Sequence, residues 1–278
     1  MKIVSFISLK GGVGKTTLVS NLATELAIRG KKVLLIDLDL QANLSMTFFN
    51  SEEYMQYSRE GKTIAALYSK RLFDKEEKKI KDIIISPQLV NQDIVSNFSV
   101  ACPIDMVISD LGLINNSNQK FRPNKLKDSL SGIREFYDVV LIDCPPSIGN
   151  LNEAAIIASD YYVIPAIPNF LSVMGIDLTM KFVNEMKIEH AIENLEFLGV
   201  LFNMVRVYGG EPIKQHIEVM KEVRDKDFPI FSNYIPFYEP NAFVDVYNNG
   251  SMFLDTNDIA NSILLEKLVD EFIKQLNL

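Results

Sequence analysis

The chain has 278 residues, of which 47% are hydrophobic, and 28 Lys and Arg against 36 Asp and Glu give a formal net charge of −8 at pH 7. This length and apolar content can bury one large core, and two cysteines are too few for a disulfide framework. The longest uncharged window, residues 161–176, contains Pro165 and Pro168 and is shorter than a membrane span. We therefore expect a cytoplasmic protein without a signal peptide or a membrane partner.

Apolar runs alternate along the chain with segments of helical apolar spacing. The runs predict strands over residues 2–7, 32–36, 98–101, 137–142, 161–164, 196–202 and 231–235. The helical spacing predicts helices over residues 15–29, 62–70, 122–134, 150–159, 172–190, 212–226 and 257–276. This alternation predicts an α/β protein with a single doubly wound, mostly parallel sheet and helices on both faces. We expect residues 1–278 to form one domain.

The first predicted strand leads into a glycine-rich loop, residues 8–17, and the first predicted helix follows directly. Strand, glycine-rich loop and helix in this order are the context of a phosphate-binding loop. The glycines let backbone N–H groups close around phosphate oxygens, and the helix N-terminus adds the positive end of its dipole. Lys15 is expected to contact the β- and γ-phosphates of ATP, and the Thr16 hydroxyl to bind Mg²⁺. The predicted nucleotide contacts from this loop are Gly11, Gly12, Val13, Gly14, Lys15, Thr16 and Thr17.

Two further predicted strands end in carboxylates. Asp37 and Asp39 follow the strand at 32–36, and Asp143 ends the strand at 137–142. Because open α/β sheets bind ligands at the carboxyl ends of their strands, these side chains are expected to face the nucleotide. Asp143 would hold Mg²⁺ through water, since this ion keeps several of its own waters. Taken alone, the pair of aspartates after the earlier strand could equally cap a loop.

The phosphate loop departs from the general pattern G-x-x-x-x-G-K-[ST] in two places, because Leu9 replaces the first glycine and a second lysine, Lys10, stands ahead of the paired glycines. This KGGVGKTT form resembles the deviant Walker A loop of the ParA/MinD family of ATPases. Residues 37–45, DLDLQANLS, resemble the first switch segment of that family, with Leu40 where proline is usual. Residues 143–147, DCPPS, resemble its second switch segment.

The resemblance implies an ATP-dependent homodimer in which Lys10 reaches into the partner subunit and contacts its nucleotide. It also implies that Asp39 positions the attacking water, while Asp37 supports the Mg²⁺ shell or the loop. Hydrolysis needs a carboxylate that orients water in line with the γ-phosphate, because enzymes that hydrolyse ATP contribute mainly by positioning the reactants and compensating charge. The expected catalytic residues are Lys10, Lys15 and Asp39, and the expected metal-site residues are Thr16, Asp37 and Asp143.

Two later segments are predicted to hold the base. Asn203 follows the strand at 196–202 with an amide that both donates and accepts hydrogen bonds, which suits an adenine edge. Residues 235–239 lie where the ParA/MinD family has an I-P-R-N loop against adenine, and here Phe and Tyr replace the arginine and asparagine. The expected base contacts are Asn203, Pro236 and Tyr238. A strand-end asparagine and a proline turn without a ligand are the alternative.

Relatives of this ATPase type suggest three competing functions. A carrier of an iron–sulfur cluster would need cysteines at the dimer axis, but Cys102 and Cys144 form no C-x-x-C pattern, and we expect both to be small buried residues. A MinD-like ATPase would end in a basic amphipathic helix that binds a membrane. The last predicted helix has an apolar stripe with an acidic-leaning polar face, so we expect it to pack on the core.

The two switch segments favour the ParA branch. This implies a partition ATPase for a plasmid or chromosome that is slow alone, binds DNA non-specifically as the ATP dimer and is stimulated by a ParB-like adaptor protein. The acidic excess lies in residues 151–278, so contacts to DNA phosphates would need local basic clusters. The candidates are Lys181, Lys187, Arg206, Lys214, Lys221 and Arg224, although Glu218 could pair with Lys214.

The runner-up function is a MinD-like or cargo-positioning ATPase that acts on a membrane or a protein assembly. A small-molecule ligase on the same scaffold is the alternative from another class, and it would consume ATP together with a metabolite.

Overall fold

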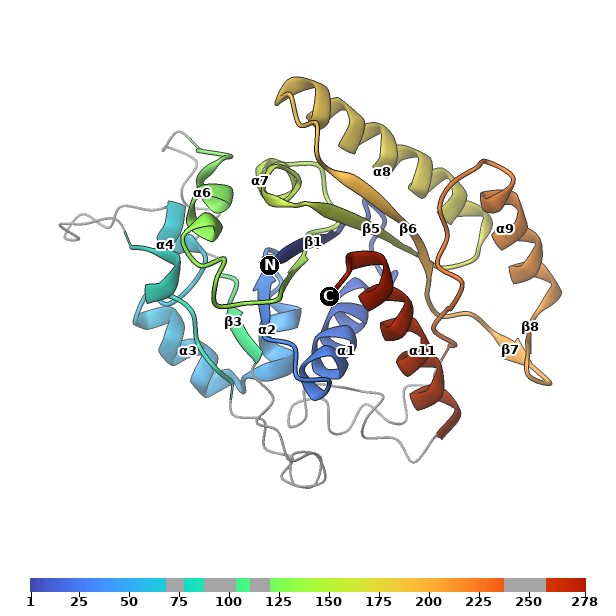
Figure 1. Cartoon of the computed structure of the whole chain (residues 1–278), viewed down its shortest axis with the longest axis horizontal. Helices are drawn as coiled ribbons and strands as arrows, with labels where there is room; N and C mark the ends of the chain where they lie inside the picture. Colours follow the sequence, from blue (N-terminus) through green and yellow to red (C-terminus); the bar gives the residue numbers. More distant parts are fainter. Residues whose placement is uncertain (69–77, 88–103, 111–120, 238–258) are drawn as a thin grey trace.

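The computed structural model describes residues 1–68, 78–87, 104–110, 121–237 and 259–278 (Figure 1). Within these residues, six parallel strands form one sheet in the order β3-β2-β4-β1-β5-β6. The strands are β1 (Lys2–Phe6), β2 (Val33–Asp37), β3 (Ile104–Val107), β4 (Val139–Asp143), β5 (Tyr161–Ala166) and β6 (Glu196–Phe202). The predicted α/β fold class is confirmed.

The central strands are buried on both faces. Every residue of β2 and β4 is buried, and β1 is buried except for its first residue, Lys2. Strands covered on both sides form continuous apolar runs, which is why the sequence revealed them. In the sheet register, Phe6 and Asp37 are both aligned with Asp143. The carboxyl ends of β1, β2 and β4 therefore lie at one level, where the phosphate loop begins.

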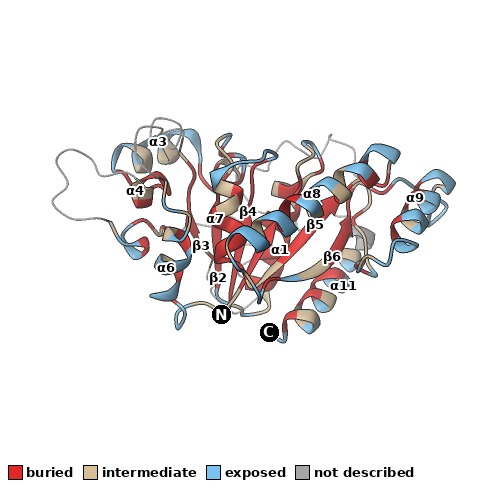
Figure 2. Ribbon diagram, turned by 90° about the horizontal axis from the view of Figure 1, so that it is seen from above, coloured by how far each residue is buried: buried red, intermediate tan, exposed pale blue. Residues whose placement is uncertain are grey.

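Helices cover both faces of the sheet, and each face has its own apolar core. One face carries α1 (Lys15–Ile28), α2 (Asn43–Phe48) and α11 (Ile259–Leu276). The other carries α4 (Ala65–Tyr68), α6 (Lys125–Ser131), α7 (Asn150–Ala158), α8 (Phe170–Glu189) and α9 (Lys214–Arg224). The remaining elements are α3 (Ser51–Arg59), the 3₁₀ turn η1 (Ile80–Asp82) and a hairpin of β7 (Val207–Tyr208) and β8 (Glu211–Pro212). Figure 2 shows buried residues in the strands and on the inner faces of the helices, with exposed residues outside.

The C-terminal helix α11 packs on the core, as its acidic polar face predicted. The described part of its apolar stripe is buried, and the Phe272 ring stacks with Phe6 and Phe231 at centroid distances of 6.4 and 6.5 Å. Arg29, which follows α1, pairs with Glu25 at 2.8 Å and with Asp270 of α11. Among the described residues, none of the helices combines the length and apolar character needed to cross a membrane.

The sequence did not predict the strand β3. Residues 98–101 lie outside the described residues, and β3, Ile104–Val107, pairs with β2 on the side opposite β4. Asp105 interrupts the apolar run of this edge strand, and its carboxylate accepts a hydrogen bond from the Tyr137 hydroxyl at 2.6 Å. A charged residue on the exposed side of an edge strand hides the strand from a search for continuous apolar runs.

Residues 231–235 do not form the predicted strand. Phe231 and Ile235 donate backbone hydrogen bonds to β6, but the intervening amides of Ser232 and Asn233 donate to the Glu271 carboxylate of α11 at 2.7 and 3.1 Å. Backbone N–H groups that donate to a helix side chain are not available to a neighbouring strand, so the ladder of hydrogen bonds is interrupted here. The predicted helix at 62–70 is described only as the short α4, since the residues from 69 to 77 lie outside the described ranges.

Candidate nucleotide-binding site

The glycine-rich loop, residues 8–17, connects the carboxyl end of β1 to the N-terminus of α1. Gly14 is the N-cap residue of α1 with φ 76°, a left-handed conformation that favours glycine. A Cβ atom at Gly14 would also lie 2.3 Å from Nδ2 of Asn203, so a side chain does not fit there. Because glycine has no side chain with which to cap the helix, the first backbone N–H groups of α1 are available to an anion.

Lys15, the first residue of α1, turns its side chain back into the loop. The residue is only 7% exposed, and its Nζ donates to the backbone oxygen of Ser8 at 3.4 Å. An ammonium that is largely removed from water, and has only a long hydrogen bond, is stabilised when an anion binds beside it. The loop therefore surrounds a positive charge at the point where a phosphate would lie.

Asp143 and Thr16 meet beside the loop. The Thr16 hydroxyl donates to Oδ2 of Asp143 at 2.7 Å, while Oδ1 is buried and accepts no hydrogen bond from the described residues. Burial raises the pKa of Asp143 to about 6, although the hydrogen bond from Thr16 and the charge of Lys15 lower it. A buried carboxylate oxygen without a donor is costly unless a cation balances it. Oxygen ligands of this kind are those that Mg²⁺ prefers, so the residues present fit that ion.

Asp37 holds the segment after β2. Its Oδ1 accepts the backbone N–H of Asp39 at 3.0 Å, and its Oδ2 accepts the backbone N–H and hydroxyl of Ser45 at 2.8 and 2.7 Å. Burial raises the pKa of Asp37 to about 8, and the nearby charge of Asp143 adds to the effect. Both carboxylate oxygens of Asp37 are thus engaged with the segment after β2.

Asp39 is half-buried and lies two residues beyond the end of β2. Its Oδ1 accepts the backbone N–H of Gln41 at 3.0 Å, and its backbone oxygen accepts the N–H of Ala42 at 2.8 Å. These bonds fold the segment into a tight turn, because a short acidic side chain readily bonds the backbone two residues ahead. The turn brings Asp39 to the same edge of the sheet as Asp143 and the phosphate loop.

Lys10 contacts the beginning of α8. Its Nζ donates to Oδ1 of Asn169 at 2.9 Å and to the Ser172 hydroxyl at 3.2 Å. Asn169 is the N-cap residue of α8, and its Oδ1 also accepts the backbone N–H of Ser172 at 3.0 Å. Sequence reasoning missed both partners, although an asparagine at the start of a predicted helix is a recognised capping signal.

Asn203 lies against the phosphate loop. Its Nδ2 donates to the backbone oxygens of Val13 at 2.9 Å and Gly14 at 3.4 Å, and its Oδ1 accepts the N–H of Met204 at 2.9 Å. Pro236 is half-buried beside the end of β6, where it forms an isolated bridge with Val205. Tyr238 lies outside the described residues. The structure thus brings Asn203 to the loop itself, with its amide engaged within the chain.

Several of the basic residues considered for DNA contacts have partners of their own. Lys214 pairs with Glu218 at 3.9 Å and Lys181 with Glu185 at 4.0 Å, each one helical turn away. The Nζ of Lys187 donates to the backbone oxygen of Leu195 at 2.9 Å. Cys144 is fully buried, and burial raises the pKa of its thiol, as expected for a structural cysteine, whereas Cys102 lies outside the described residues.

Phosphate-loop NTPases combine a parallel sheet with a glycine-rich loop between a strand and a helix. The fold of this chain places it in that class. A family model described as AAA domain matches residues 1–197. The chain belongs to that family, in its ParA/Soj branch of partition ATPases.

Three relatives illustrate this membership. The sporulation initiation inhibitor protein Soj of Bacillus subtilis is 30% identical over 84% of this chain and 84% of its own length. The virulence plasmid ParA family protein pGP5-D of Chlamydia psittaci is 32% identical over 73% of this chain and 69% of its own length. A putative plasmid partition protein from Borrelia burgdorferi, solved with AMPPNP, has a TM-score of 0.75, 26% identity and 99% coverage of both chains.

Two more distant structures show the fold alone. Cobyrinic acid a,c-diamide synthase from Mycobacterium smegmatis, solved with an ATP analogue and magnesium, has a TM-score of 0.74 at 18% identity, covering 100% of this chain and 96% of its own. A variant of McdA from Cyanothece, solved as a complex with ATP, has a TM-score of 0.74 at 21% identity, covering 100% of this chain and 97% of its own.

Proposed function

We propose that this chain is an ATP-dependent dimerising switch for plasmid or chromosome partition, with residues 1–278 acting as one ATPase domain. The observation that carries the proposal is that the two lysines of one loop direct their side chains to different places. The Lys15 side chain is buried inside the loop, whereas the Lys10 side chain points out of the loop and contacts the first turn of α8. One lysine serves the nucleotide of its own chain, and the other serves a nucleotide in a second copy.

The remaining site residues take the following roles. The backbone N–H groups of residues 11–17 bind the phosphates, helped by the N-terminus of α1. Thr16 and Asp143 would hold Mg²⁺, which would supply positive charge to neutralise the β- and γ-phosphates. Asp37 supports the turn that presents Asp39, and Asp39 orients the attacking water. By the sequence resemblance, Asn203, Pro236 and Tyr238 are assigned to the base.

The ATP dimer binds DNA without sequence preference, and a ParB-like adaptor accelerates hydrolysis, which releases both partners. The partition proteins among the relatives support this assignment. ATP and Mg²⁺ as cofactors are supported by nucleotide-bound structures of the same fold, one of which contains magnesium.

The experiment that tests the proposal uses the Asp39→Ala variant, which should bind ATP but fail to hydrolyse it. Light scattering gives the mass in ADP and in ATP, and DNA is followed by co-elution. We expect a dimer that forms only with ATP and carries DNA. A monomer in ATP would contradict the dimer, and unchanged ATP turnover in this variant would remove Asp39 from its role.

A second candidate is a cargo-positioning ATPase that recognises a protein assembly. The pairing of Lys214 and Lys181 with glutamates favours it, because paired lysines offer less charge to DNA phosphates. An ATP dimer that ignores DNA would support this candidate. The membrane form of the alternative is disfavoured because the described stripe of α11 is buried in the core.

A further inference from the structure

A cavity of about 520 Å³ lies between η1 and α6, away from the phosphate loop. Its lining residues are Lys78, Lys79, Ile80, Lys81, Lys125, Asp128, Ser129, Gly132 and Ile133. None of these described residues belongs to the candidate nucleotide site. Its volume falls within the usual range for small-molecule sites.

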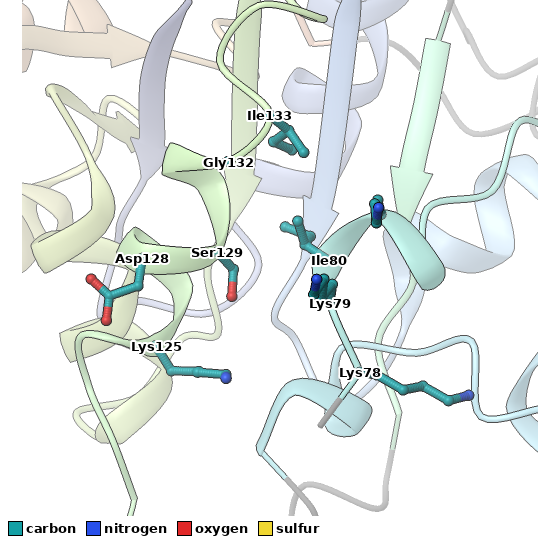
Figure 3. A pocket seen from close by; sticks show the side chains of 9 residues that line it. Lys78, Lys79, Ile80, Lys125, Asp128, Ser129, Gly132 and Ile133 are labelled. Atoms are coloured by element: carbon teal, nitrogen blue, oxygen red, sulfur yellow. The ribbon is translucent and has the colours of Figure 1, made fainter. Parts of the chain in front are cut away.

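The lining is strongly positive in a chain whose formal net charge is −8. Four lysines face one acid, Asp128. Figure 3 shows Lys125 pointing from α6 toward η1, whereas Asp128, on the same helix, points away from the gap. The carboxylate of Asp82, next to the cavity, is occupied by the backbone N–H of Lys79 at 2.9 Å. Among its described lining residues, the cavity thus has four lysines and a single carboxylate.

One of these cations is held in place by the fold. The Nζ of Lys78 donates to the backbone oxygens of Glu60 and Gly61 at 3.2 and 3.0 Å, just after the end of α3. The Glu60 side chain is itself engaged, because Lys62 approaches its carboxylate at 2.8 Å. Figure 3 shows the Lys78 side chain pointing away from α6, so Lys78 lies at the edge of the cavity and its ammonium is committed to these backbone oxygens.

The floor of the cavity is apolar and rigid. Ile80 is 3% exposed and Ile133 5% exposed, and both belong to the core on that face of the sheet. Ser129 adds a hydroxyl that can donate to an anion. A firm floor with a lysine rim suits a compact, multiply charged group better than an extended acidic peptide. Phosphate carries more charge in a given volume than a carboxylate side chain.

We propose that the cavity between η1 and α6 is a second anion site, which takes phosphate groups carried either by a DNA backbone or by a small phosphate ester. The DNA source rests on the proposed function, whereas the small-molecule source does not. Lys79 and Lys81 are exposed and flank Ile80, so they offer the charge that a ligand meets first.

The first test uses tripolyphosphate as the probe, on full-length protein whose phosphate loop is saturated with ADP and Mg²⁺. The variant is Lys79→Glu with Lys81→Glu, and the matched control is Lys267→Glu with Lys274→Glu, two exposed lysines on α11. Calorimetric titration should show binding at least tenfold weaker in the cavity variant and unchanged in the control. Equal ADP affinity and equal thermal midpoints show that both variants are folded.

The second test measures binding of a duplex DNA to the ATP-bound Asp39→Ala protein at several salt concentrations. Loss of two phosphate contacts should lower the slope of log affinity against log salt by about 2 in the cavity variant. If tripolyphosphate and DNA binding both fall, DNA is the source, and if only tripolyphosphate binding falls, the source is a small phosphate ester. If neither falls, or if poly-glutamate binds the cavity more tightly than tripolyphosphate, the proposal is overturned.

The two proposals fail in different ways. If the unmodified protein binds no DNA, DNA binding is removed from the proposed function. The cavity site stays intact if tripolyphosphate binding still depends on Lys79 and Lys81. If the unmodified protein and both lysine variants bind DNA equally well, and the substitutions have no effect on tripolyphosphate binding, the cavity site is removed and the partition function stays intact.

Discussion

The ammonium of Lys10 and the N-cap oxygen of α8 share one hydrogen bond, with Lys10 Nζ lying 2.9 Å from Oδ1 of Asn169. The same oxygen accepts the backbone N–H of Ser172 at 3.0 Å, so Asn169 both caps the helix and binds Lys10. A cation near a helix N-terminus opposes the helix dipole, which makes this contact weaker than an equivalent one at the other end of the helix. The two hydrogen bonds that hold Lys10, to Asn169 and Ser172, are thus partly offset by the helix dipole.

Substitutions at Asn169 should change how much ATP is needed for dimerisation. Asn169→Ala releases Lys10 and should lower the ATP concentration at which half the protein is dimeric, at a cost of about 1 kcal/mol in stability for the lost cap. Asn169→Asp keeps the cap and pairs with Lys10, so more ATP should be required. Light scattering during an ATP titration in the Asp39→Ala background measures both, and identical curves for Asn, Ala and Asp would show that the contact plays no part.

The two loop lysines should separate binding from dimerisation. Lys15→Ala removes the buried ammonium inside the loop and should weaken ATP binding by at least 100-fold, an effect of about 3 kcal/mol. Lys10→Ala should bind ATP normally and remain monomeric. Titration with a fluorescent ATP analogue gives the affinities and light scattering the masses. A Lys10→Ala protein that dimerises normally with ATP would rule out the trans role of this lysine.

Gly14 and Gly12 form a matched pair for testing the loop geometry. Both have positive φ, 76° and 73°, so alanine at either position should cost about 1 to 2 kcal/mol for the backbone alone. At Gly12 the added Cβ meets nothing within 4 Å, whereas at Gly14 it would lie 2.3 Å from Nδ2 of Asn203. Gly14→Ala should therefore be less stable than Gly12→Ala by a further 1 to 3 kcal/mol, about the usual penalty of overpacking.

Urea unfolding of the ligand-free proteins measures this difference. Adding Asn203→Ala to each variant provides the control, because it removes the atom that the new Cβ would strike. The second substitution should recover part of the loss in Gly14→Ala and none in Gly12→Ala. Equal effects in both backgrounds would mean that Asn203 does not restrict this loop.

Phe272 should be a major source of stability at the C-terminal helix. It is fully buried, and its ring stacks with Phe6 of β1 and Phe231 beside β6. Phe272→Ala should lower the free energy of unfolding by about 3 to 5 kcal/mol, while exposed Lys274→Ala on the same helix should change it by less than about 0.5 kcal/mol. Denaturant unfolding measures both, and a small loss at Phe272 would show that α11 is only loosely attached.

The sequence by itself determined the phosphate loop, the acids at the ends of β2 and β4 and the α/β class. Local patterns carry these features. A buried parallel strand is a continuous apolar run, and a phosphate loop requires glycines and a lysine at set spacings. Asp37 and Asp143 end two neighbouring parallel strands, and the register aligns them at one edge of the sheet.

Only the tertiary structure decided which distant groups complete the site. Asn169 reaches Lys10 across 159 residues of sequence, and Asn203 reaches Val13 across 190. Glu271 takes the backbone donors of residues 232 and 233 and so prevents the strand that their apolar neighbours predicted. Such hydrogen bonds depend on distances and directions in the folded chain, which the spacing of apolar residues does not encode. Ten consecutive residues are enough to identify the phosphate loop. Which distant residues contact that loop depends on how the strands and helices pack in the folded chain.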